Sequence, residues 1–157
     1  MRKANKKDIL SNIFYSTETI LISHFLVSAA IYYFLCIRIN LNLGKIVTIL
    51  DNSTLTLSGI FIAFLNTSFA LLFSVNNEKL SFLEKTGNIK ALYKLNLGST
   101  ICFILSLLFH FVLKILKNFI LYKYSLLIAH ITLFTFLCGL IFMLEMTRFM
   151  MKIFLKK

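Results

Sequence analysis

Long apolar runs alternate with short polar and basic segments along the whole chain. Each run is about 20 residues long, which is the length at which an α-helix crosses the hydrocarbon core of a bilayer. The chain also lacks proline, so nothing interrupts the helical pattern within a run. The pattern therefore predicts an all-α integral membrane protein with four transmembrane helices, over residues 16–37, 53–75, 95–116 and 125–149.

These spans occupy most of the sequence, and we expect residues 1–157 to form a single membrane domain. No remaining segment reaches the roughly 50 residues that a soluble domain requires. The first apolar run continues to about Arg38 without a small-residue cleavage site. We therefore expect it to remain as a span rather than to be removed as a signal peptide.

The connector at 76–94, between the second and third spans, is amphipathic. Asn76 or Asn77 can cap a first short helix, and Gly87 suits the left-handed position just past its end. Asn88 can then cap a second helix that continues into the third span. The segment is therefore predicted to be a helical connector with its elbow at Gly87.

Basic residues are distributed unequally between the two sides of the predicted bundle. The chain has 17 lysine and arginine residues and a formal net charge of +11. Four spans place the arm 1–8, the connector 76–94 and the tail 148–157 on one side, and these hold 12 of the basic residues. Because basic loops stay in the cytoplasm, both termini are predicted to be cytoplasmic, in a multi-pass protein of the bacterial inner membrane.

This basic side has two possible partners. Anionic lipid headgroups attract such residues at a membrane surface. Single-stranded DNA or another oligonucleotide would also bind them, and an aromatic ring among them could stack on a base. The candidate ligand-binding residues are Lys6, Lys7, Lys85, Lys90, Tyr93, Lys94 and Lys152.

Small and polar residues recur at helical spacing in the second and third spans. Such a stripe can serve close helix packing, because small residues let helices approach and hydroxyls bond across them. It can also face a water-filled path, since amides and imidazoles in spans generally avoid lipid. Both readings stay open for Gly59, Ala63, Asn66, Ala70, Ser99, Ser106 and His110.

Signatures of catalysis and of cofactor binding are lacking. The sequence has no zinc-protease or nucleophile-elbow motif, and its five glycines form no phosphate-binding loop. Cys36, Cys102 and Cys138 fall inside predicted spans and have no metal-site spacing with histidine. We expect a protein that is not an enzyme and that holds no cofactor or metal.

One part of the chain resembles a known family. LSGIFIAFLNTSFALLFSV, followed by SFLEKTGNIKALYKLNL, is similar to small membrane effectors of bacterial phage-defence systems. The Hailong-type channel effectors are the first candidate and the Kiwa-type membrane proteins the second, over residues 57–99. The Hailong resemblance implies a homotetrameric four-span channel that is held shut by an oligonucleotide from a partner nucleotidyltransferase.

Two functions follow as hypotheses. The first is an oligomeric channel or pore, an effector of antiviral defence that is gated by an anionic signal and depolarises the membrane when released. The alternative is a non-conducting anchor or scaffold subunit of a larger membrane complex. Both would use the small-residue stripes, and both would contact membrane lipids.

Overall fold

The structure, a computed structural model, describes residues 17–50, 52–75, 88–117 and 122–155. Over these residues it consists of α2 (Thr17–Ile39), α3 (Leu43–Ile49), α4 (Asn52–Val75), α6 (Asn88–Lys117) and α7 (Tyr122–Leu155), with no strand. Four of these helices, α2, α4, α6 and α7, are long and apolar enough to cross a membrane. The prediction of an all-α chain with four candidate spans is confirmed, and the pattern is that of a multi-pass membrane protein.

The helices extend beyond the predicted spans where basic residues flank the apolar runs. α6 begins at Asn88 and continues unbroken to Lys117, so the second half of the connector is one helix with the third span. α7 likewise continues through the basic tail to Leu155. The first half of the connector, including Gly87, lies outside the described residues.

A short helix, α3, occupies the segment between the first two spans. Its seven residues are too short for a span, so the search for long apolar runs does not predict it. The Asn42 side chain caps it by accepting a hydrogen bond of 2.9 Å from the Lys45 amide. Ile46 and Leu50 are buried in a cluster with Leu113 and Leu133, which attaches α3 to the ends of α6 and α7.

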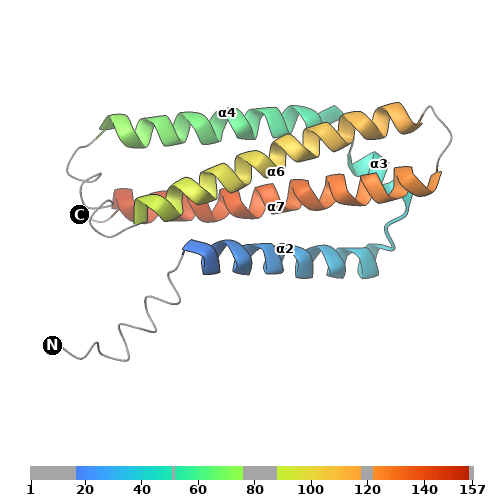
Figure 1. The fold of residues 1–157 in the computed structure, drawn as a ribbon, viewed down its shortest axis with the longest axis horizontal. Helices are drawn as coiled ribbons and strands as arrows, with labels where there is room; N and C mark the ends of the chain where they lie inside the picture. The colour runs from blue at the N-terminus through green and yellow to red at the C-terminus, as the bar shows by residue number, and fades with distance from the viewer. Residues whose placement is uncertain (1–16, 51, 76–87, 118–121, 156–157) are drawn as a thin grey trace, which may run out of the picture.

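The long helices are arranged around the antiparallel pair α6 and α7, whose packing is the most extensive in the described chain. α4 lies along one side of this pair, where it contacts α6, and α2 lies along the other side (Figure 1). The first residues of α2 and α6 and the last residues of α4 and α7 all lie at the same end of the bundle (Figure 1). This arrangement is what four successive membrane crossings require.

Phe103 lies at the centre of the main apolar cluster. Its side chain is fully buried and packs with Leu65 of α4 and Phe142 of α7. The ring lies directly against Gly139, where an added Cβ would come within 2.9 Å of Phe103 Cε1. The absence of a side chain at Gly139 thus allows α6 and α7 to pack closely at this position.

α2 is the peripheral helix of the bundle. Phe25, Leu26, Phe34 and Ile37 are each at least half exposed, and Ser28 is buried. A helix whose large apolar side chains point outward suits contact with lipid rather than with water.

Gly139→Ala is expected to destabilise the protein by about 1–3 kcal/mol, because the new methyl group overpacks a closed part of the core. Gly98→Ala is the matched control, since its Cβ would meet Phe142 at an ordinary contact distance of 3.6 Å. Thermal unfolding in detergent measures both. Equal stability of the two variants would contradict the close approach at Gly139.

Candidate functional site

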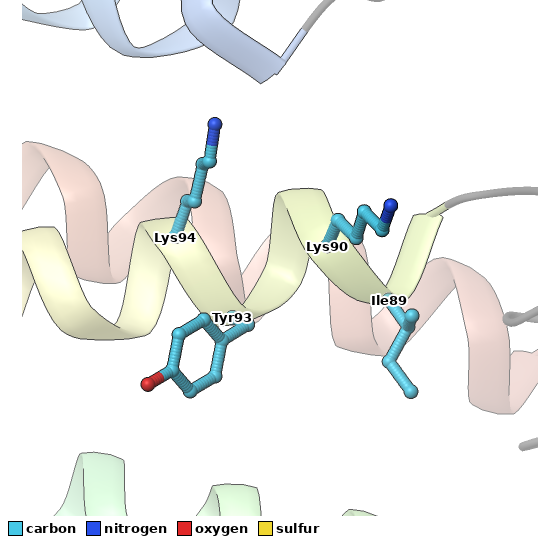
Figure 2. Close-up of a pocket in the computed structure, with 4 residues that line it drawn as sticks. All are labelled: Ile89, Lys90, Tyr93 and Lys94. Carbon is cyan, nitrogen blue, oxygen red and sulfur yellow. The ribbon is translucent and has the colours of Figure 1, made fainter.

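Two of the predicted ligand-binding lysines lie on the first turns of α6. Lys90 and Lys94 are four residues apart; the Lys94 side chain points toward α2, and the Lys90 side chain extends alongside the first turn of α6 (Figure 2). Ile89 and Tyr93 extend from an adjacent side of the helix, toward α4 (Figure 2). Together the four residues line an open surface cavity of about 310 Å³.

Tyr93 is not a free stacking platform. Its ring packs against Phe69 of α4, with the centroids 5.9 Å apart and a tilt of 54°. The side chain is still 53% exposed, so part of the ring lines the cavity. The sequence predicts that Tyr93 and the lysines act on one ligand, but they lie on adjacent sides of the helix.

The position of Lys94 along α6 indicates its depth in a membrane. Lys94 and Lys114 are separated by 20 residues, or about 30 Å of helix, which matches the hydrocarbon thickness of a bilayer. The apolar part of α6 between them is therefore long enough to fill the hydrocarbon core. If the hydrocarbon core is centred on this part of the helix, Lys90 and Lys94 lie at the level of the lipid headgroups.

The remaining residues of the predicted basic surface are not described in full. Lys6, Lys7 and Lys85 lie outside the described residues. Lys152 belongs to α7, with its side chain outside the described set.

The polar stripe of α6 faces the inside of the protomer. Ser99 donates a hydrogen bond of 2.8 Å to the Gly139 carbonyl, and Ser106 donates one of 3.2 Å to the Thr132 carbonyl. Both serines and His110 are buried. The two hydroxyls are therefore used in attaching α6 to α7.

The stripe of α4 faces the opposite way. Gly59, Ala63, Asn66 and Ala70 are all exposed, while Ser58 and Leu65 on the other face are buried. No atom lies within 4 Å of the place that a Cβ on Gly59 would occupy, apart from the helix itself and the neighbouring residues. The two stripes, which look alike in the sequence, thus differ in their surroundings.

A charged cluster joins α2 to α7, and its long-range part could not be read from the sequence. Glu145 Oε2 lies 3.5 Å from Arg148 Nη1, the three-residue pair that the helical spacing predicts. It also lies 3.7 Å from Nε2 of His24 on α2. His24 Nδ1 lies 2.6 Å from the Ile20 carbonyl oxygen. A carbonyl can only accept a hydrogen bond, so Nδ1 is the protonated nitrogen of the neutral ring. Nε2 can therefore donate to Glu145 only when the ring is charged.

A second polar contact links the same two helices near the other end. The Tyr32 hydroxyl hydrogen-bonds to Nδ1 of His130, and the Tyr32 ring packs edge-on against Phe134. Phe25 adds another edge-on contact with Phe134, at a centroid distance of 5.5 Å. Polar and aromatic contacts therefore join α2 to α7 at two separate places along the helix.

Comparison with known proteins identifies no relative: neither the protein-family models, nor the curated proteins, nor the solved structures contain a match to this chain.

At a pH where the His24 ring is protonated, Glu145→Gln is expected to lower the free energy of unfolding by about 1 kcal/mol, because one carboxylate then interacts with both His24 and Arg148. Arg148→Gln is the control and is expected to change it by less than about 0.5 kcal/mol, since the arginine is largely exposed. Thermal unfolding in detergent at constant pH compares the two. Equal losses for the two variants would contradict a stabilising contact between Glu145 and His24.

Proposed function

We propose that this protein is the subunit of an oligomeric membrane channel, in which the α4 helices of neighbouring copies meet. The observation that carries the proposal is the outward-facing stripe of Gly59, Ala63, Asn66 and Ala70, which is defined here as the α4 stripe.

Asn66 is the most informative residue of the α4 stripe. It lies nine residues before the end of α4, or about 14 Å along the helix, which is near the middle of a 30 Å hydrocarbon core. A carboxamide at that depth is unfavourable in contact with lipid. Asn66 residues from several copies can bond to one another, or they can face water, and either arrangement needs a second copy.

Glycine and alanine on the same face favour such a contact. They let helix backbones approach closely, which drives helix association where lipid already surrounds every apolar surface. The corresponding hydroxyls of α6 are occupied by carbonyls of α7. A hydrated path is therefore better supported between copies than within one copy.

The resemblance of residues 57–99 to Hailong-type effectors extends this proposal. It supports a homotetramer, a role in antiviral defence, and opening that depolarises the cell when an anionic ligand is released from the basic end. The unequal distribution of lysine and arginine supports insertion in the bacterial inner membrane with both termini in the cytoplasm.

Gly59→Leu is expected to abolish self-association and ion flux while leaving the protomer folded. The protomer has open space at this position, whereas a neighbouring α4 would be pushed away. Phe64→Leu, at an exposed apolar position of α4, is the control and should keep both properties. Native mass spectrometry in detergent and dye-detected flux into liposomes provide the measurements.

The possible outcomes separate channel from anchor. A wild-type protein that is only monomeric, or a Gly59→Leu variant that still assembles, would exclude the α4 interface. An oligomer that carries no ions under any condition would favour the non-conducting anchor or scaffold.

Orientation is tested by labelling single cysteines in a chain whose Cys36, Cys102 and Cys138 have been replaced. A membrane-impermeant maleimide added to intact cells is expected to label Asn42→Cys and not Lys90→Cys, since these exposed positions flank different ends of the bundle. Labelling of the second position alone would mean that the topology is inverted.

A further inference from the structure

We infer that the first two turns of α6 form a binding site for one anionic phospholipid. Lys90 and Lys94 would hold the headgroup phosphate, and Ile89 and Tyr93 would cover the adjoining glycerol and acyl chain. The site needs only one copy of the chain, so it does not depend on the proposed channel.

Charge complementarity favours an anionic headgroup. Lys90 and Lys94 are four residues apart, so their backbone positions share one face of α6 on successive turns, and both side chains are drawn in Figure 2. Lysine binds phosphate as a point charge with several donors, and a phosphodiester between two lysines can interact with both.

The apolar side of the cavity favours a lipid over a hydrophilic anion. Ile89 and Tyr93 line the cavity of about 310 Å³ next to the lysines. Tyr93 has an apolar ring partly packed on Phe69 and a polar hydroxyl at its tip, which is the combination enriched at membrane–water interfaces. The lysines line the cavity with their apolar stems, so an acyl chain can lie in it while the headgroup phosphate reaches the ammonium groups at its edge.

Depth in the membrane provides a separate argument. Lys94 lies about 30 Å along the helix from Lys114, so the cavity begins where the hydrocarbon core ends. A phospholipid carries its phosphate at this level, in the leaflet where α6 begins. An oligonucleotide would have to leave water for the headgroup region to reach the same residues, and Tyr93 offers it only the part of its ring that Phe69 leaves open.

The test is a titration of the purified full-length protein in detergent with dioleoyl phosphatidylglycerol, read by native mass spectrometry. Dioleoyl phosphatidylcholine is the zwitterionic comparison. We expect one phosphatidylglycerol to be retained more strongly than phosphatidylcholine. Lys90→Gln and Lys94→Gln are each expected to weaken phosphatidylglycerol binding about fivefold and to leave phosphatidylcholine binding unchanged.

Two further variants separate a built site from general attraction. Lys114→Gln removes an exposed lysine from the other end of the same helix and is expected to have no effect on the retained lipid. Tyr93→Ser is expected to weaken the binding of both dioleoyl lipids, because it removes part of the apolar lining. Tyr93 and Lys90 are exposed, so both variants should fold, and circular dichroism checks their helicity.

Three results would overturn the site. One is equal retention of the two lipids. Another is a loss of phosphatidylglycerol binding in Lys114→Gln as large as the loss in Lys94→Gln, which would mean that net charge attracts the lipid diffusely. The third is displacement of phosphatidylglycerol by a single-stranded DNA 20-mer. If the binding of this DNA depends on Lys90 and Lys94 and not on Tyr93, the surface is an oligonucleotide site.

Discussion

The Ser99 hydroxyl donates to the Gly139 carbonyl at the point where the Phe103 ring lies against Gly139. Inside a membrane, apolar side chains gain nothing by leaving lipid for one another, so helices associate through close packing and through hydrogen bonds between them. Ser106 repeats the bond to α7 two turns further along α6. The closely packed pair α6 and α7 is the centre against which α4 and α2 pack.

The functional proposals follow from how this centre uses its polar groups. The hydroxyls of Ser99 and Ser106 on α6 are hydrogen-bonded inside the protomer, while Asn66 on α4 is exposed on its surface. A protein surface that contacts lipid rarely exposes such a group. This difference is the reason for proposing that α4 contacts another copy. The basic start of α6 is the part for which we propose an anionic ligand.

Periodicity and length were sufficient to predict the four long helices, since an apolar run of span length has few other structures open to it. The pattern did not predict α3, whose helical form depends on the Asn42 cap and on the burial of Ile46 by distant helices. The stripes containing Asn66 and Ser106 were recognised by their spacing. Their opposite environments could not be predicted in this way. Spacing shows which residues share a face of a helix, but it does not show what that face contacts. The contact of His24 with Glu145 joins residues far apart in the chain and required the fold.

The most direct measurement is disulfide crosslinking in native membranes, with single cysteines introduced at Asn66 of α4 and at Ile104, an exposed position of α6. The three native cysteines are first replaced. If copies meet through α4, mild oxidation is expected to give a covalent dimer for Asn66→Cys and little for Ile104→Cys. No dimer at position 66, or equal dimer at both positions, would contradict the account.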